Sequence, residues 1–302
     1  MTATRAGFVA LAGRPNVGKS TLVNAVVGHK VAIVSDKPQT TRRAIRGVAT
    51  VDGAQLVLVD LPGVQRPRDA LTVRMQRRVE SELAGADQAL LLLNGDQGVG
   101  GPGDLFIAHA LAVAAAAPRA LPVTVAVNKV DRLDQARTVR ALQAAADLAP
   151  PEAEVFPISA RTGAGVPELV AHLAALLPEG PFLFAAGDPS DQREDVLLAE
   201  LVREQVLRRT RQEVPHAVEV EVSEIDRPPG GHVTVRALLW VETESQKGIL
   251  IGARGAMVRA IGTAARRELE RELGADVFLD LGVRVRRGWR ADEHLLDRLG
   301  IE

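Results

Sequence analysis

The sequence predicts an α/β domain built on a doubly wound sheet, followed by a small α+β domain. Over residues 7–177, near-continuous apolar runs such as QLVLVD and QALLLLN alternate with helical segments, which is typical of parallel strands covered on both faces. A stretch rich in proline and glycine then ends this pattern. Beyond it, AVEVEVSEI and HVTVRALLWVET alternate in polarity, as the strands of an antiparallel pair do.

The elements of the first domain can be assigned in order. GFVALAG, QLVLVD, QALLLLN and LPVTVAV are expected to be buried strands, and EVFPISA is expected to be extended. Helices are expected in KSTLVNAVVG, GDLFIAHALAVAAAA, TVRALQAAADLA and VPELVAHLAALLP. Strands separated by helices indicate a doubly wound α/β domain, which we place at residues 1–178.

A linker is expected at residues 179–195 and the second domain at 196–302. A helix is predicted over roughly 192–211, with Asp191 and Glu194 as a capping box. The antiparallel strand pair follows, then a short helix, a glycine loop, a long helix and a last strand in DVFLDLGVRVRR. This order describes a small α+β domain.

Composition excludes several classes of protein. Hydrophobic residues make up 46% and charged residues 25% of the chain, as in globular proteins. The absence of cysteine excludes disulfides, thiolate zinc sites and a cysteine nucleophile. MTATRAG lacks an apolar signal region, and no run reaches the ~18 apolar residues of a membrane span. A reducing cytosol fits the absence of cysteine.

GRPNVGKST contains the pattern GxxxxGK[ST], with Gly13, Gly18, Lys19 and Ser20 at its fixed positions. It lies between a predicted strand and a predicted helix, which is the context this phosphate-binding motif requires. Glycines let backbone N–H groups approach phosphate oxygens, and the helix N-terminus favours negative charge. Lys19 is expected to reach the β- and γ-phosphates, and Ser20 to bind Mg²⁺.

NKVD, with Asn128, Lys129 and Asp131, follows the strand LPVTVAV and indicates which base is bound. A carboxylate there can accept hydrogen bonds from N1–H and the exocyclic NH₂ of guanine, an edge that adenine lacks. A site built on such pairing rejects the wrong base strongly, because that base leaves buried polar groups unpaired. The pattern therefore predicts GTP and GDP as ligands.

DLPG at the end of QLVLVD supplies two further candidates. Asp60 is expected to hold Mg²⁺, and Gly63 to donate its N–H to the γ-phosphate. Within DKPQTTRR, Thr41 is the first candidate for a switch threonine that binds Mg²⁺ and the γ-phosphate, and Thr40 is the second. Loss of that phosphate would release the loop.

Val64 follows DLPG, where Ras-like enzymes carry a glutamine that positions water. A valine cannot orient water, so intrinsic GTP hydrolysis should be slow or be assisted by another group. We consider K⁺ held near Asn16 as that group.

Gly252, Ala253, Arg254 and Gly255 form a GXXG loop between two predicted helices, a setting in which KH domains clamp single-stranded nucleic acid. Ile249, Ile251, Val258 and Ile261 are expected to floor a groove for bases. Residues 247–290 hold ten positive charges, including Lys247, against five negative ones, so this segment is +5 in a chain of −1. This asymmetry favours a nucleic-acid partner.

Taken together, these motifs resemble the Era family of bacterial ribosome-associated GTPases over essentially the full chain. The resemblance rests on GRPNVGKSTLVNAVVG, KPQTTR, DLPGV, NKVD, ISA, LPEGP, REQVLRRTRQEVPH, QKGILIG and IGTAARRELERELG. It implies GTP hydrolysis, a type II KH domain that binds the 3′ end of 16S rRNA, and a role in assembly of the 30S subunit. It also implies a cytoplasmic protein with peripheral contact to the inner face of the cell membrane. A monomer that binds no DNA is expected.

The resemblance also assigns roles to residues at matching positions. Lys19, Thr41, Asp60, Gly63 and Asn16 form the expected catalytic set, with Ser20, Thr41 and Asp60 at Mg²⁺. The residues expected to bind the nucleotide are Gly13, Arg14, Pro15, Asn16, Val17, Gly18, Lys19, Ser20, Thr21, Asp60, Leu61, Pro62, Gly63, Asn128, Lys129, Asp131, Ser159 and Ala160. Backbone N–H groups of Ser159 and Ala160 are expected to support the guanine carbonyl. Lys247, Ile251 and the loop Gly252 to Gly255 are expected to bind RNA.

Two departures from the family pattern affect these roles. Leu61 replaces a frequent threonine. The KH loop is GARG where the family often has GKGG, so its positive charge moves by one position.

Two alternatives remain. The first is a membrane-linked signalling G protein whose C-terminal domain binds protein. The second is an RNA chaperone with a vestigial nucleotide site, which is disfavoured because every guanine-site element is present.

Overall fold

The structure, a computed structural model, describes residues 4–37, 40–63, 69–116, 120–185 and 187–301. The chain divides into two compact units. The first comprises Met1–Ala32, Thr41–Arg66 and Met75–Asp191, and the second comprises Ile33–Thr40, Pro67–Arg74 and Gln192–Glu302. Two short segments from the first quarter of the chain therefore belong to the mainly C-terminal unit.

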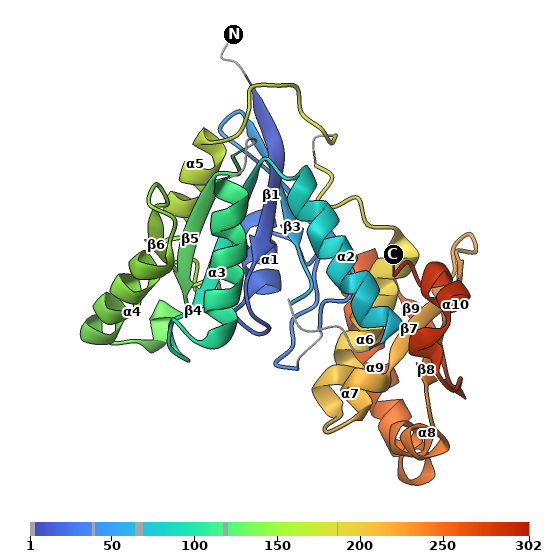
Figure 1. Ribbon diagram of the computed structural model, residues 1–302. Helices are drawn as coiled ribbons and strands as arrows, with labels where there is room; N and C mark the ends of the chain where they lie inside the picture. Colours follow the sequence, from blue (N-terminus) through green and yellow to red (C-terminus); the bar gives the residue numbers. More distant parts are fainter. Residues whose placement is uncertain (1–3, 38–39, 64–68, 117–119, 186, 302) are drawn as a thin grey trace. The chain divides into compact units, whose positions relative to one another are not determined.

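The first unit contains a six-stranded sheet in the order β2-β3-β1-β4-β5-β6 (Figure 1). In chain order the strands are β1 Arg5–Ala12, β2 Ile45–Val51, β3 Ala54–Asp60, β4 Gln88–Asn94, β5 Val123–Asn128 and β6 Val155–Pro157. Neighbouring strands are parallel except β2 and β3, which are antiparallel. The predicted doubly wound α/β fold is confirmed, with an antiparallel strand at one edge.

The edge strand β2 was absent from the sequence-based assignment. It pairs with β3 through a two-residue turn, in which Asp52 has φ 47° and Gly53 has φ 80°. Positive φ at both turn residues matches the twist of a tight hairpin, and Asp-Gly is a frequent sequence for it.

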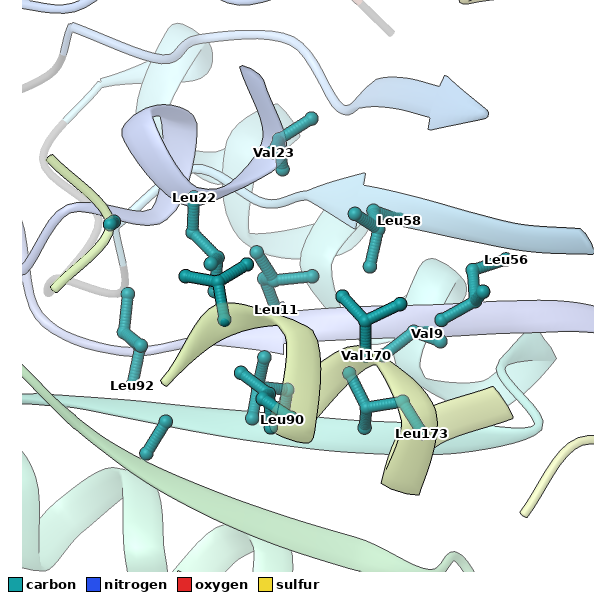
Figure 2. Packing of buried hydrophobic residues seen from close by; sticks show 14 of the residues in the cluster. Val9, Leu11, Leu22, Val23, Leu56, Leu58, Leu90, Leu92, Val170 and Leu173 are labelled. Atoms are coloured by element: carbon teal, nitrogen blue, oxygen red, sulfur yellow. The ribbon is translucent and has the colours of Figure 1, made fainter. Parts of the chain in front are cut away.

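Helices cover both faces of this sheet. The helices are α1 Lys19–Val27, α2 Ala70–Gly85, α3 Pro102–Ala115, α4 Gln135–Leu148 and α5 Val166–Ala175. On one face, α1 and α5 bury Leu22, Val23, Val170 and Leu173 against leucines and valines of β1, β3 and β4 (Figure 2). On the other face, the apolar sides of α2, α3 and α4 pack against the same strands and β5. The sheet is therefore buried on both sides, which explains its near-continuous apolar strands.

Three chain segments that carry the predicted nucleotide motifs meet at one edge of this sheet. β1 ends at Ala12, β3 at Asp60 and β5 at Asn128. Because these strands are parallel, their carboxyl ends lie at the same edge, which is where doubly wound folds bind ligands. The register places Leu11 opposite Asp60 and Asn94 opposite Asn128.

The second unit contains a three-stranded sheet in the order β7-β8-β9. Its strands are β7 Glu219–Asp226, β8 Val233–Val241 and β9 Val277–Val285. β7 and β8 are antiparallel as predicted, and β8 and β9 are parallel. The helices α6 Glu194–Arg209, α8 Glu244–Ile251 and α9 Ala256–Leu273 bury their apolar sides against this sheet. This order of elements confirms the predicted α+β fold.

The second unit also has helices that the sequence did not indicate. These are α7 Val214–Ala217, a 3₁₀ turn at Trp289–Ala291 and α10 Glu293–Arg298. Trp289 is fully buried, and its indole N–H donates to the carbonyl of Ala217 at 2.8 Å.

Among the described residues, no helix combines the length and apolar character needed to cross a bilayer.

The predicted capping box at the start of α6 is wrong. Arg193 occupies the N-cap position, and its side chain makes no capping hydrogen bond. Asp191 instead accepts a hydrogen bond from Arg46 at 3.0 Å. A capping box does form at α8, where Thr243 and Gln246 satisfy each other's backbone N–H groups.

Candidate functional site

The phosphate loop joins β1 to α1 and depends on glycine at two positions. Gly18 has φ 107°, and a Cβ there would lie 2.3 Å from Nδ2 of Asn128. A Cβ at Gly13 would lie 2.5 Å from the carbonyl oxygen of Leu92. Any larger residue would push the loop away from the segments behind it. The loop therefore leads directly into the N-terminus of α1, where backbone N–H groups favour an anion.

Lys19 is buried within this loop. Its ammonium donates to the carbonyl oxygens of Gly13 at 3.0 Å and Arg14 at 3.3 Å. Burial lowers the pKa of Lys19, and the negative charge of Asp60 opposes this effect. The lysine is thus held at the loop, where a phosphate oxygen could stabilise its charged form.

Ser20, Thr41 and Asp60 converge beside Lys19. Ser20 Oγ donates to Asp60 Oδ2 at 2.5 Å, and the hydroxyls of Ser20 and Thr41 lie 3.2 Å apart. Thr41 Oγ1 also donates to Asp60 Oδ2 at 3.4 Å. Thr40 turns away, because its hydroxyl donates to the carbonyl of Lys37 at 2.6 Å. The structure therefore brings Thr41, the first candidate, to this cluster and not Thr40.

The cluster fits a hard divalent cation. Asp60 is fully buried, and its Oδ1 has no hydrogen-bond partner among the described residues. Burial raises the pKa of Asp60, against the opposing effects of Lys19, Ser20 and Thr41. Mg²⁺ commonly binds one or two carboxylates together with water and substrate phosphates. An unpaired buried carboxylate oxygen next to two hydroxyls meets that requirement.

Asn128 connects the guanine motif to the phosphate loop. Its side-chain amide donates to the carbonyl of Val17 at 2.8 Å, and its Oδ1 accepts from the backbone N–H groups of Lys129 at 2.8 Å and Ala160 at 2.9 Å. Lys129 has φ 68°, and its ammonium donates to the carbonyl of Asn16 at 2.7 Å. Burial, aided by the charge of Arg132, lowers the pKa of Lys129.

Asp131 presents an oriented carboxylate. Ser159 Oγ donates to its Oδ1 at 2.7 Å, and Arg161 donates to its Oδ2 at 2.6 Å. The hydrogen bond from Ser159 is the main reason that the pKa of Asp131 lies below its ordinary value, and Arg161 adds to the effect. The group is therefore ionised at neutral pH, as an acceptor for N–H donors must be.

The expectation for the backbone of Ser159 and Ala160 is not met. The N–H of Ser159 donates to the carbonyl of Ala164 at 2.8 Å, and that of Ala160 donates to Asn128. Both groups have protein acceptors, so neither points at a base in this structure. The contribution of Ser159 is through its side chain, which the sequence pattern ISA did not distinguish.

Arg14, expected among the nucleotide-binding residues, has a different partner. Its guanidinium forms two hydrogen bonds to the buried carboxylate of Asp104, at 2.6 and 3.0 Å. A Cβ at Gly103 would lie 2.6 Å from Cδ of Arg14, so the helix α3 approaches the arginine closely. The pair fixes the phosphate loop to the start of α3. Nothing in the local sequence of Asp104 indicated this role.

The remaining predicted nucleotide residues lie in the same region. Val17 and Leu61 are buried, and a Cβ at Gly63 would lie 2.8 Å from Cγ of Pro15, so DLPG packs against the phosphate loop. Pro62 is buried and Thr21 is partly buried. Val64 lies outside the described residues.

In the second unit, the GXXG loop joins α8 to α9 as a single 3₁₀ turn at Ala253–Gly255. Gly252 has φ 71°, Arg254 φ 53° and Gly255 φ 76°. A Cβ at Gly252 would lie 2.7 Å from Cβ of Met257, so the tight turn requires glycine there. Ala253 and Arg254 are exposed.

Arg259, which the sequence analysis did not single out, supports this loop. Its guanidinium donates to the carbonyl of Arg254 at 2.6 Å. Lys247 lies on α8, 4.0 Å from a carboxylate oxygen of Glu244. The loop region thus presents several cations around a backbone turn.

The expected groove floor needs one correction. Ile249 is 49% exposed and Ile251 is partly buried, so both can meet a ligand. Val258 is also partly buried. Ile261 is fully buried in the core of the second unit and cannot face a ligand.

Known protein families match both the nucleotide-binding part of the chain and the part that carries the GXXG loop. Residues 8–129 match the family described as 50S ribosome-binding GTPase, and residues 213–290 match the KH domain family. The chain is 45% identical over 303 residues to GTPase Era of Mycobacterium avium (strain 104), and 44% identical to GTPase Era of Mycobacterium tuberculosis (strain ATCC 25618 / H37Rv). Both comparisons cover 100% of each chain.

Two solved structures are similar over 99% of both chains, each with 34% identity and a TM-score of 0.91. One is a variant of Aquifex aeolicus Era bound to GDP·AlF₄⁻. The other is Era in complex with MgGDPNP and nucleotides 1506–1542 of 16S ribosomal RNA. Because close relatives match the chain from end to end, it belongs to the Era family of GTPases, GTP-hydrolysing enzymes with an N-terminal GTPase domain and a C-terminal KH domain.

Proposed function

We propose that this protein is a GTP-dependent switch that binds the 3′ region of 16S rRNA through its KH domain and acts in assembly of the 30S subunit. The observation that carries the proposal is that one chain holds both a complete guanine-nucleotide cluster and an intact GXXG loop. We place the GTPase domain at residues 1–178, the linker at 179–195 and the KH domain at 196–302.

The nucleotide roles follow from the positions of the side chains. Gly13 to Thr21 surround the phosphates, with Lys19 as their cation. Ser20, Thr41 and Asp60 would hold Mg²⁺, and the ion would neutralise part of the negative charge on the phosphates. Gly63, packed on Pro15, offers its backbone N–H to the γ-phosphate. A relative with MgGDPNP bound supports this assignment.

Base selection rests on Asp131, which accepts from N1–H and the exocyclic amine of guanine. Asn128 and Lys129 hold the motif against the phosphate loop, and Ser159 orients the Asp131 carboxylate and lowers its pKa. Adenine presents no matching donors at N1, so ATP should bind far more weakly.

Hydrolysis is proposed to be slow without assistance, because Val64 cannot orient water. K⁺ near Asn16 is proposed to stabilise charge that develops between the phosphates. The backbone carbonyl of Asn16 accepts a hydrogen bond from Lys129, and we assign the contribution to K⁺ to the Asn16 side chain.

RNA binding is proposed at Lys247, Ile251 and Gly252 to Gly255. The relative bound to nucleotides 1506–1542 of 16S rRNA supports this partner. Within the loop, Arg254 takes the place of the lysine found one position earlier in GKGG. We further propose a cytoplasmic monomer with peripheral membrane contact and no DNA partner.

The test is binding of the full chain to a labelled RNA of the 16S 3′ segment, with and without a GTP analogue. Gly255→Asp adds a negative charge to the loop, and among the described residues its Cβ would meet the side chain of Arg259, at 3.5 Å. Gly230→Asp is the matched control, because Gly230 also has positive φ, 72°, and its Cβ would meet nothing within 4 Å.

Gly255→Asp should weaken RNA binding by about tenfold or more through phosphate repulsion, and Gly230→Asp should leave it unchanged. Both variants should hydrolyse GTP like the parent. If Gly255→Asp binds RNA as tightly as the parent, the loop is not the RNA site. A protein-binding C-terminal domain, as in a membrane-linked signalling G protein, would then be favoured.

A further inference from the structure

The helix α6 carries an unusual concentration of buried charge. Arg203 and Glu204 have no solvent-exposed surface, and neither does Glu219 on β7. Glu200 is 3% exposed. Burying charges costs free energy even when they are paired, and a well-packed apolar core would often serve stability as well. Stability alone therefore does not account for this cluster.

Arg203 is held by two carboxylates and in turn holds a backbone. Its Nε and Nη2 donate to Glu200 at 3.2 and 2.6 Å, and Glu219 lies 3.9 Å from Nε. Burial alone would lower the pKa of Arg203, but Glu200 and Glu219 raise it above its ordinary value. Nη2 also donates to the carbonyl oxygen of Thr40. The guanidinium is therefore a permanent cation that binds the residue before Thr41.

Glu204 holds the other end of the same segment. Its Oε1 accepts from the backbone N–H of Val34 at 3.0 Å and from Arg208 at 3.1 Å. Val34 and Thr40 are thus each bound to one of two adjacent residues of α6. Both bonds involve charged groups, which make hydrogen bonds of about twice the usual strength.

The boundary between the two compact units falls immediately after these contacts. Residues 33–40 belong to the unit that contains α6, whereas Thr41 belongs to the unit that contains the nucleotide cluster. Thr41 Oγ1 lies 3.2 Å from Ser20 Oγ and donates to Asp60. One peptide bond therefore joins the anchor on α6 to the threonine at the proposed metal site.

A second early segment is held by the same unit. Arg74, in residues 67–74, donates to the carbonyl of Ile301 at 2.8 Å and to Asp297 at 2.6 Å. Arg290 lies 3.6 Å from a carboxylate oxygen of Asp69. Unlike the α6 cluster, Asp297 is mostly exposed, so its ion pair with Arg74 is individually weak.

We propose that Arg203 and Glu204 are positioning residues for GTP recognition, which hold Thr40 and Val34 so that Thr41 reaches Mg²⁺ and the γ-phosphate. The inference rests on the proposed role of Thr41. Since coupling between two binding events is reciprocal, the γ-phosphate that stabilises Thr41 also stabilises the segment on α6, at the first helix of the KH-containing unit. GDP lacks the γ-phosphate that Thr41 is proposed to bind, so GDP should gain less from the anchor.

The test compares affinities of the full chain for a non-hydrolysable GTP analogue and for GDP. Glu204→Ala should lower the affinity for the GTP analogue by about tenfold, which is the effect of losing one hydrogen bond to a charged group. The affinity for GDP should stay within about twofold of the parent value. Glu204→Gln should recover most of the loss, because its amide oxygen can still accept from Val34. Arg209→Ala is the matched control, since Arg209 is on the same helix and bonds Gln205 instead of the segment.

Arg203→Lys tests the other end, because a lysine cannot bind Glu200 and the Thr40 carbonyl with one planar group. Thr41→Ala separates this inference from the proposed function. If Thr41→Ala leaves the preference for the GTP analogue intact, the proposed role of Thr41 fails. If Thr41→Ala removes the preference and folded Glu204 and Arg203 variants keep it, only the anchor is wrong.

Hydrogen exchange of the unsubstituted protein gives an answer that does not depend on variants folding. The amide of Val34, bonded to Glu204, should exchange at least about fivefold more slowly with the GTP analogue than with GDP. Equal exchange in the two states would overturn the proposal.

Discussion

The side-chain amide of Asn128 donates to the carbonyl of Val17 at 2.8 Å, across 111 residues of sequence. A Cβ on Gly18 would lie only 2.3 Å from this same Nδ2 atom. The residue that opens the guanine motif is therefore packed into the back of the phosphate loop. Base recognition and phosphate binding depend on one buried contact.

Replacing Asn128 should consequently damage both the fold and the ligand site. Asn128→Ala leaves the carbonyl of Val17 and the N–H groups of Lys129 and Ala160 without their present partner. We expect the nucleotide-free protein to lose about 2–4 kcal/mol of stability and guanine nucleotides to bind at least about tenfold more weakly.

Two probes of urea unfolding can localise this effect. Both tryptophans, Trp240 and Trp289, lie in the second unit, so tryptophan fluorescence follows that unit alone. Far-ultraviolet circular dichroism follows both units. The variant should shift the dichroism transition and leave the fluorescence transition in place; a common shift of both signals would contradict a local role.

Ser159→Ala should change the pH dependence of guanine binding. The hydrogen bond from Ser159 depresses the pKa of Asp131, so the ionised carboxylate and its contribution are present above the unfolded value of 3.8 and are lost as pH falls through the lower folded value. Without Ser159 the pKa moves toward its ordinary value. GDP affinity, measured from about pH 7 to about pH 4, should therefore begin to fall at higher pH in the variant.

Arg161→Ala is the comparison for this prediction. Arg161 is exposed, where solvent screens its charge, and its hydrogen bond to Asp131 lowers the pKa less than that of Ser159, so its removal should shift the profile less. Superimposable profiles for Ser159→Ala and the parent would show that Ser159 does not control the ionisation of Asp131.

The sequence predicted the layers and the motif positions because both follow from local patterns. Apolar runs identified β3, β4 and β5, and each nucleotide motif begins at or just after the end of a strand. β2 was missed although Asp52 and Gly53 carry a recognisable hairpin signal, since its alternation is weak. The capping box failed because Asp191 binds Arg46, a partner 145 residues away.

Long-range polar contacts carried no local signal. Arg14 and Asp104 are 90 residues apart, and Arg203 and Thr40 are 163 apart. The sequence predicted α6 as a helix but not its environment, in which residues 198–207 are all buried. Charged residues inside a helix are normally assigned to solvent, so only the fold could reveal that these hold another segment.

Asn16 provides a test of the proposed K⁺ dependence. It has φ 63°, so alanine there would add backbone strain of about 1–2 kcal/mol. Asn16→Gly removes the side chain without that strain. GTP hydrolysis by the parent should be faster in K⁺ than in Na⁺ at equal ionic strength, and Asn16→Gly should abolish the difference while GDP affinity stays within about threefold.

Asn16→Asp is the companion variant, because aspartate tolerates positive φ and keeps a side-chain oxygen for a cation. It should retain a K⁺ effect. Equal rates in K⁺ and Na⁺ for the parent protein would contradict a cation at this position.

Arg259 should strengthen RNA binding by holding the GXXG loop in shape. It donates to the carbonyl of Arg254, a non-glycine residue at φ 53°, and so stabilises a backbone conformation that arginine rarely adopts. Arg259→Ala should therefore weaken RNA binding by about three- to tenfold, the effect of one hydrogen bond to a charged group. Arg267→Ala, an exposed change further along α9, is the control and should have little effect.

Salt dependence distinguishes support of the loop from direct phosphate contact. Loss of one phosphate contact reduces the slope of log affinity against log salt by about 0.7 for single strands. Arg254→Ala should show that reduction, because its side chain is exposed at the turn. Arg259→Ala should lower affinity with a smaller change in slope, since its guanidinium is bonded to the loop backbone. An equal reduction in slope for both variants would instead make Arg259 a phosphate ligand, and unchanged affinity would show that the loop holds its shape without it.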